Sequence, residues 1–216
     1  MADKQTTEYV DLAGIENLYV ARVSQNTAST YEVDTPRELA GVASLKKTVE
    51  STTEKVYYSN RTAYTINNVS DPVLELTISA LDNETLAYIT GTPYDKTRKA
   101  LYGGDSEPVE CALLYEYGKI NGDKVYCVYY AGTFSYPEVE NNTKADSPVH
   151  NGMTITFTST KTQKAFTNGG RVSYTEYEVA GGDLSSAPVK LQNFYTEVLT
   201  PDTIQAQTQT ETEQVI

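Results

Sequence analysis

The residue types that carry acid–base, nucleophilic or metal chemistry are scarce in this sequence of 216 residues. His150 is the single histidine and lies in SPVHNG, an expected loop, with no cysteine at zinc-ligand spacing nearby. The sequence has no G-x-S-x-G elbow, P-loop or G-x-G-x-x-G fingerprint. Any acidic β protein offers carboxylate pairs of the glycosidase kind, but no single pair stands out. We therefore expect no enzyme, with no catalytic residue, no cofactor and no metal.

The two cysteines enclose a segment, CALLYEYGKINGDKVYC, that predicts a β-hairpin turning at Asn121-Gly122. A loop of two or four residues would place Cys127 opposite Glu116. The period of two along a strand would then put the sulfurs of Cys111 and Cys127 on opposite faces. We expect free thiols, which suit a protein made in the cytoplasm. Both faces of this hairpin are apolar, which predicts a central strand pair covered on both sides.

The strong acidity of the chain limits its partners. There are 29 Asp and Glu against 17 Lys and Arg, a net charge of −12. Such a chain should not bind nucleic acid by neutralising phosphates, although a surface that faces DNA without binding it would also be acidic. The first residues, MADKQTTEYV, lack the basic start and apolar stretch of a signal peptide. No apolar run approaches the roughly 18 residues of a membrane span, so we expect no membrane partner.

Short β-rich runs separated by turn signals make up most of the chain, so strands must position its functional residues. The runs VLELTIS and MTITFTST alternate apolar and polar residues, and RVSYTEYEV is a further strand with mixed faces. The apolar faces of the first two runs are Leu74, Leu76 and Ile78, and Met153, Ile155 and Phe157. This alternation predicts a mainly β fold, an antiparallel β-sandwich or barrel.

One flanking helix is expected in SALDNETLAYITG. Ser79 can cap its start and Gly91 can close its end. Leu81, Tyr88 and Ile89 share a face, whereas Leu86 does not.

A second flanking helix is expected near the end of the chain. Its spacing i, i+3, i+4, i+7, i+8 is formed by Leu191, Phe194, Tyr195, Val198 and Leu199. The proline at position 201 should stop it.

The stretch Gly41–Tyr58 has strand character but almost no apolar face through Lys46–Lys55. Such a ribbon is marginal in water unless it pairs with another strand, from this chain or from a neighbouring subunit. We expect a long projecting hairpin here, and the alternative is a solvated loop.

The order of these segments resembles the major tail protein family of siphoviruses that infect Gram-positive bacteria. The resemblance covers residues 9–201. Its most specific parts are the LYVARV start, VYYSNRT after the ribbon, the hairpin LLYEYGK…VYCVYYAGTFSYPE and the terminal pattern F-Y-x-x-V-x-x-P. Related proteins tend to have a run closer to FYADN where this chain has VYYSNRT.

We divide the chain into an N-terminal arm (1–8), a tail-tube β-sandwich domain (9–201), which the resemblance covers, and a polar C-terminal extension (202–216). The resemblance implies that six copies join their strands into a ring, and that rings stack into the tail tube of the virion after synthesis in the host cytoplasm. DNA and the tape measure protein would pass through the lumen without specific binding. The tail terminator and distal tail proteins would bind the tube.

Acidic side chains should line such a lumen, because they would repel phosphates. Glu50 and Glu54 share a face by the period of two, as do Glu138 and Glu140. These four are the candidate lumen-facing residues, and the alternative is that they are solvated on the outside.

Two other functions stay open at this point. One is a monomeric cell-surface or secreted β-sandwich adhesin or carbohydrate-binding module, which a signal peptide should accompany. The other is a tail terminator or baseplate hub subunit of similar fold. Electron microscopy of the purified protein would separate tubes, single rings and monomers.

Overall fold

Strands dominate the structure, a computed structural model that describes residues 10–104, 106–139, 152–185 and 187–206. Helix α1 spans Asn83–Thr90, and a 3-10 turn, η1, spans Ala180–Gly182. The longer strands are β1 (Leu12–Asn26), β4 (Val42–Thr48), β5 (Ser51–Tyr58), β6 (Arg61–Val69), β7 (Val73–Ile78), β10 (Cys111–Lys119), β11 (Lys124–Tyr129), β14 (Met153–Thr160) and β15 (Tyr174–Val179). The shorter strands are β2 (Tyr31–Val33), β3 (Arg37–Glu38), β8 (Tyr94–Asp95), β9 (Ala100–Leu101), β12 (Ala131–Phe134) and β13 (Glu138–Val139).

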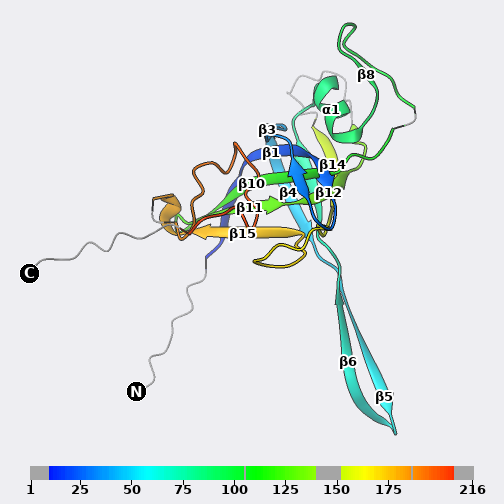
Figure 1. Cartoon of the computed structure of the whole chain (residues 1–216), viewed down its shortest axis with the longest axis vertical. Helices are drawn as coiled ribbons and strands as arrows, with labels where there is room; N and C mark the ends of the chain where they lie inside the picture. The colour runs from blue at the N-terminus through cyan, green and yellow to red at the C-terminus, as the bar shows by residue number, and fades with distance from the viewer. Residues whose placement is uncertain (1–9, 105, 140–151, 186, 207–216) are drawn as a thin grey trace, which may run out of the picture.

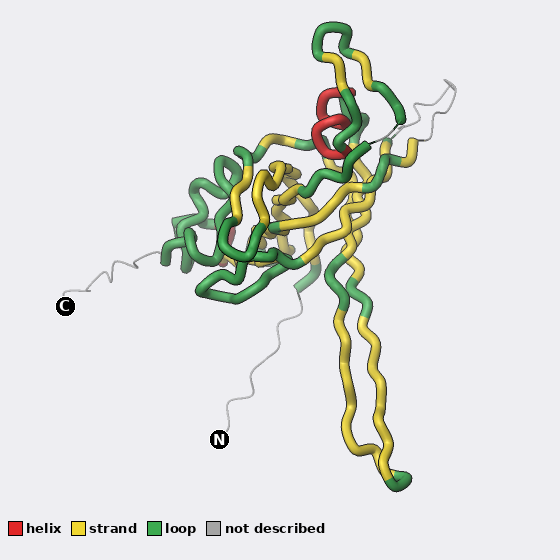
Figure 2. Tube along the Cα trace, turned by 45° about the vertical axis from the view of Figure 1, so that its right-hand side comes forward, coloured by secondary structure: helices red, strands yellow, loops and turns green. Residues whose placement is uncertain are grey.

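Two antiparallel sheets form the body of the molecule. The first has the strand order β15-β11-β10-β1-β2, with β3 also paired to β1, and the second has the order β12-β14-β7-β4, with β13 also paired to β14. Side chains of both sheets meet in one buried cluster, where the ring of Tyr129 lies edge-on to that of Phe157 at 6.1 Å. The predicted antiparallel sandwich is confirmed, and Figure 2 shows its strands in yellow, joined by loops in green.

The other face of the first sheet is covered by the C-terminal part of the domain. Val128 and Tyr130 belong to a second buried cluster together with Leu191, Phe194 and Leu199. Strands β10 and β11 therefore lie between two cores, as their two apolar faces predict.

The β10–β11 hairpin turns over three residues, 120–122, because a backbone hydrogen bond closes the loop just outside them and Gly122 takes a left-handed φ of 91°. A loop of this odd length shifts the strand pairing by one position relative to the expected even loops. Cys127 consequently lies opposite Tyr115, and the predicted pairing with Glu116 is wrong.

The two sulfurs therefore lie on the same face of the sheet, in the same buried cluster, and not on opposite faces as expected. Cys111 and Cys127 are nevertheless free thiols. Cys127 is opposite Tyr115, four positions along β10 from Cys111, which corresponds to about 13 Å at strand rise. A disulfide requires Cα atoms within about 7 Å, so separation along the strand is what keeps the thiols apart.

Helix α1 begins later than the sequence predicts. Asp82, and not Ser79, is the N-cap, because its carboxylate accepts a hydrogen bond from the Thr85 N–H at 2.6 Å. Hydrogen bonding to Thr85 also holds the pKa of Asp82 below its usual value. Gly91 ends the helix in the left-handed conformation, as predicted. Leu86 is buried, contrary to expectation, because the short helix contacts both β9 and β12.

The segment from Leu191 to Leu199 forms consecutive turns, so the predicted second helix is wrong. Its burial follows the predicted spacing, with Phe194 packed in the second core. The backbone N–H and the hydroxyl of Thr196 both donate to the carbonyl of Asn193, three residues earlier. Asn and Thr favour such local bonds over a continuous helix, and the apolar residues can be buried without one.

The ribbon Gly41–Tyr58 divides into two strands that belong to different sheets. β4 forms an edge of the second sheet, whereas β5 pairs with β6 in a hairpin that leaves the body. Figure 1 shows this hairpin projecting from one end of the molecule, with α1 and β8 at the other. The projecting hairpin is confirmed, its partner strand comes from the same chain, and the solvated-loop alternative is wrong.

Candidate assembly surfaces

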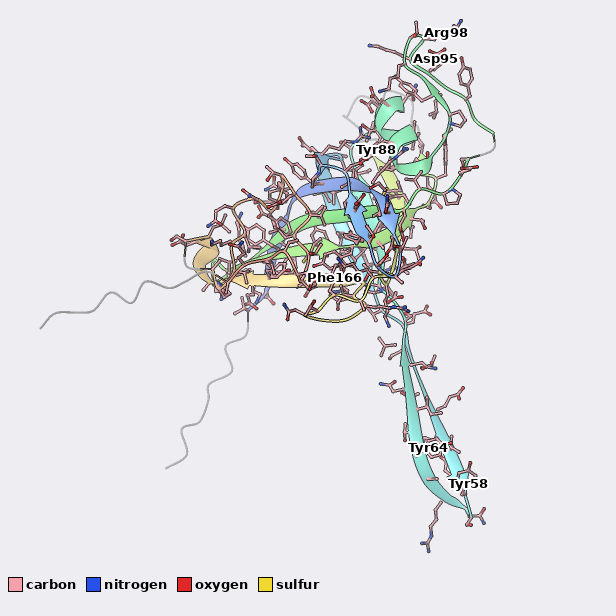
Figure 3. The ribbon with its side chains drawn as sticks, viewed as in Figure 1. Tyr58, Tyr64, Tyr88, Asp95, Arg98 and Phe166 are labelled. Carbon is pink, nitrogen blue, oxygen red and sulfur yellow. The ribbon has the colours of Figure 1, made fainter. Side chains whose placement is uncertain are left out.

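The projecting hairpin carries an apolar face that the described part of the chain leaves uncovered. Cross-strand pairing places Val56 opposite Tyr64 and Glu54 opposite Ile66, and paired side chains share a face. Tyr58 continues this face, with its ring centroid 6.4 Å from that of Tyr64; both rings lie toward the free end of the hairpin in Figure 3. Tyr58, Tyr64 and Ile66 are 64%, 51% and 41% exposed.

The opposite face of the hairpin is mainly polar, apart from the exposed side chains of Tyr57 and Val69. Thr53 pairs with Asn67 and donates a hydrogen bond from its hydroxyl to the amide oxygen at 3.0 Å, and Lys55 pairs with Thr65. An isolated two-stranded ribbon is marginal in water, and an exposed aromatic face on one side of it is typical of an interaction surface.

The hairpin is anchored where it leaves the body. The Glu50 N–H donates to the Ser70 hydroxyl at 3.0 Å, and the Ser70 N–H donates to the Glu50 carbonyl at 2.8 Å. These bonds join the segments that connect β4 to β5 and β6 to β7, so the direction of the hairpin is set by two neighbouring strands of the second sheet.

Each sheet has an edge strand on the same side of the body. In the described residues, β4 and β15 each pair with one strand only. Lys47 of β4 donates to a carboxylate oxygen of Glu176 of β15 at 2.7 Å, and its Nζ lies 3.9 Å from the ring centroid of Tyr174. Burial lowers the pKa of Lys47, but hydrogen bonding to Glu176 and the neighbouring groups outweigh burial and raise the pKa overall. A groove of about 640 Å³ runs beside this ion pair, lined in part by Leu45 and Tyr117.

Two arginines contact one tyrosine at the base of α1. The guanidinium carbon of Arg37 lies 3.3 Å from the ring centroid of Tyr88, and that of Arg22 lies 4.6 Å from the same centroid. Arg22 donates from Nε to the Tyr88 carbonyl at 2.6 Å and from Nη2 to the Ala87 carbonyl at 3.1 Å. It thereby joins β1 to the last turn of α1, where the helix dipole favours a cation. Tyr88 is labelled in Figure 3.

A buried carboxylate lies inside the first sheet. Glu116 is 3% exposed and accepts hydrogen bonds from the Asn17 side chain at 2.6 Å and from Lys124 Nζ at 3.2 Å. Asn17 has a φ of 54° at an irregularity in β1, so this bond holds the strand in an otherwise unfavourable conformation. Lys124 also donates to Glu16 at 3.2 Å. This cluster is fully paired and stabilises the fold.

Three of the four candidate lumen residues lie in the described part of the chain. Glu50 lies at the root of the hairpin and Glu54 within β5, and both are exposed. Glu138 is an exposed residue of β13, opposite Thr154 of β14. Glu140 lies outside the described residues. Glu50 and Glu54 are near one another along the hairpin, whereas Glu138 belongs to a different edge of the second sheet.

Catalytic chemistry finds no support among the described side chains. Within residues 10–104, 106–139, 152–185 and 187–206, no cluster of His, Cys, Asp and Glu could hold a metal ion. His150 lies outside these ranges. In the same part of the chain, no helix is long and apolar enough to cross a membrane.

Two surface features were not predicted from the sequence. The aromatic face of the hairpin depends on β6. Tyr64 and Ile66 alternate there with polar residues, and this alternation is the sequence pattern that indicates the face. The stacking of Arg37 on Tyr88 joins residues far apart in the sequence, and no local pattern indicates it.

The fold defines a class of protein, an antiparallel β-sandwich with exposed strand edges and a projecting hairpin. The chain belongs to the phage tail tube protein family, whose family profile matches residues 12–212. It is therefore a structural protein of the virion tail and not an enzyme, as expected. No curated protein matches the chain.

Proposed function

We propose that copies of this chain form hexameric rings that stack into the tail tube of a siphovirus, the conduit for DNA ejection. The observation that carries this proposal is the uncovered aromatic face of the β5–β6 hairpin, which the described residues of its own chain do not bury. A β-sandwich that functions as a monomer has no partner that could bury this face. In stacked rings, the adjacent ring can bury it.

Exposed strand edges support ring formation. The first sheet ends in β15 on one side and in β2 and β3 on the other, and the second ends in β4 on one side and in β12 and β13 on the other. Joining unlike edges of successive copies is a head-to-tail contact, which closes into a ring when the rotation permits. A closed barrel removes the unpaired N–H and C=O groups of the edges.

The acidic candidates fit a role in the channel. We propose that Glu50, Glu54, Glu138 and Glu140 contribute negative charge to the lumen, so that DNA and the tape measure protein pass without sticking. The tail terminator and distal tail proteins would then bind the exposed rings at the two ends of the tube. Exposure of the three described carboxylates is consistent with this role.

Electron microscopy of the purified full chain tests the proposal. We expect tubes, or rings at low concentration. A variant in which Ser51–Val69 is replaced by a short Gly-Ser turn should keep the fold, because β5 and β6 pair with no other described strand, but should form at most single rings. A wild-type protein that stays monomeric at high concentration would refute the proposal, and single rings that never stack would indicate a terminator.

A further inference from the structure

Arg37 is half-buried, and two donor atoms of its guanidinium lack a hydrogen-bond acceptor among the described residues. Its Nε and Nη2 atoms are inaccessible to solvent, and no described group accepts from them. Its neighbour Arg22 differs, because two carbonyls at the end of α1 accept from it. Stacking on Tyr88 satisfies the flat face of the Arg37 guanidinium and leaves its in-plane N–H groups unpaired.

Two buried N–H donors without acceptors are costly for the isolated subunit. Burial lowers the pKa of Arg37 and the nearby Arg22 adds to this effect, whereas Tyr88, Glu84 and Asp82 offset part of it. Neither carboxylate forms an ion pair with Arg37. The Nη1 atom is not among the buried unpaired atoms, so one side of the guanidinium stays accessible to an incoming acceptor.

The position of Arg37 in the first sheet indicates where that acceptor comes from. Arg37 lies on β3, an edge strand, and pairs with Val20 of β1. Paired residues share a face, and the row continues across the sheet through Val20, Leu113, Tyr129 and Tyr174. Arg37 and Tyr174 thus lie on the same face at opposite edges of one sheet.

The opposite edge carries carboxylates on that same face. Glu176 and Glu178 follow Tyr174 on β15 at intervals of two residues, and they pair in register with Cys127 and Val125. Their side chains are 35% and 58% exposed, and each bonds a single lysine, Lys47 and Lys119 respectively. A carboxylate has acceptor capacity for a second cation, so both can receive an arginine.

We propose that Arg37 forms an ion pair with the β15 carboxylates, Glu178 or Glu176, of the adjacent copy in the ring. This contact rests on the proposed tube, because only a head-to-tail ring brings the β3 edge of one copy to the β15 edge of the next. It gives the ring its direction, since two β3 edges would oppose cation to cation and two β15 edges would oppose carboxylate to carboxylate.

Charge reversal tests the pairing. Arg37→Glu should raise the protein concentration required for assembly at least about tenfold, because it opposes like charges at every junction. Adding Glu178→Lys or Glu176→Lys in the same chain should restore assembly, since the reversed pair then forms between neighbours. Arg98→Glu is the matched control, because Arg98 is bound by Asp95 at the far end of the molecule and should leave assembly unchanged.

Stability of the unassembled subunit separates this contact from a folding role. Arg37→Met should melt at the wild-type temperature or above it, because it removes two buried donors that lack acceptors, while still raising the assembly threshold. Wild-type tubes together with undiminished assembly of Arg37→Glu would refute the contact alone. Failure of both double variants to assemble would also refute it. A wild-type chain that forms no rings or tubes would refute the proposed tube and this contact with it.

Discussion

Substitutions on the aromatic face of the hairpin measure how strongly assembly depends on this face. We consider the double substitution Tyr64→Ser and Ile66→Ser, which removes two large side chains from β6. Both residues are exposed in the subunit, at 51% and 41%, and both face the same side as Val56. Because the hairpin pairs only with itself among the described strands, the subunit should keep its melting temperature.

The size of the effect follows from the area still open to burial. Complete burial of an Ile side chain is worth about 1.5–3 kcal/mol, so the two-fifths of Ile66 that remain exposed correspond to roughly 1 kcal/mol. A Tyr side chain buries about 150–250 Å², and half of that area corresponds to roughly 2–3 kcal/mol. The sum, roughly 3 kcal/mol or more, is on the order of a hundredfold in an association constant.

The assay is sedimentation of tubes over a range of protein concentrations, which gives the threshold for assembly. We expect the double variant to need on the order of a hundredfold more protein than the wild type. Thr65→Ser with Asn67→Ser, on the polar face of the same strand, is the control and should leave the threshold unchanged. An unchanged threshold for Tyr64→Ser with Ile66→Ser would show that this face stays in solvent and would refute the reasoning.

Three further predictions concern other parts of the molecule. Thiol titration of the denatured, unreduced protein should find Cys111 and Cys127 both free; a value near zero would contradict their separation along the ladder. Gly91→Ala should destabilise the domain by at least about 2 kcal/mol in urea unfolding, because the residue is left-handed and its new Cβ would lie 2.0 Å from a carbonyl oxygen; wild-type stability would contradict this. Changing Glu50 and Glu54 to Lys should permit normal tails but reduce DNA delivery, measured as infection titre beside tail images. Normal delivery would remove these residues from the lumen.

The sequence was sufficient to predict the features that depend on side-chain alternation. Leu74, Leu76 and Ile78 alternate with polar residues, and the structure buries all three in β7. The two apolar faces of the central hairpin similarly predict its position between two cores. These inferences succeed because the period of two is imposed by strand geometry and survives any change of neighbours.

Features that depend on one residue of loop length or on distant contacts could not be predicted. The β10–β11 turn differs from the expectation by a single residue, and that residue reverses the face on which Cys127 lies relative to Cys111. The segment around Phe194 has helical spacing, but its Asn and Thr residues bond locally, and burial alone does not require a helix. Arg37 meets Tyr88 only after β1, β3 and α1 have packed together.

The residues along the hairpin limit which part of it can line a channel and which part can contact a neighbouring copy. Along the face that begins at Glu50, polar residues come first and the apolar residues Val56, Tyr58 and Tyr64 lie toward the tip. One surface cannot serve both a water-filled channel and a dry contact over its whole length, since carboxylates lose hydration when covered and aromatics lose area when exposed. If the chain forms the proposed tube, we therefore expect the root to face the lumen and the tip to contact the adjacent ring. Glu54 lies at the transition, opposite Ile66, so reversing its charge should reduce DNA delivery less than reversing the charge of Glu50.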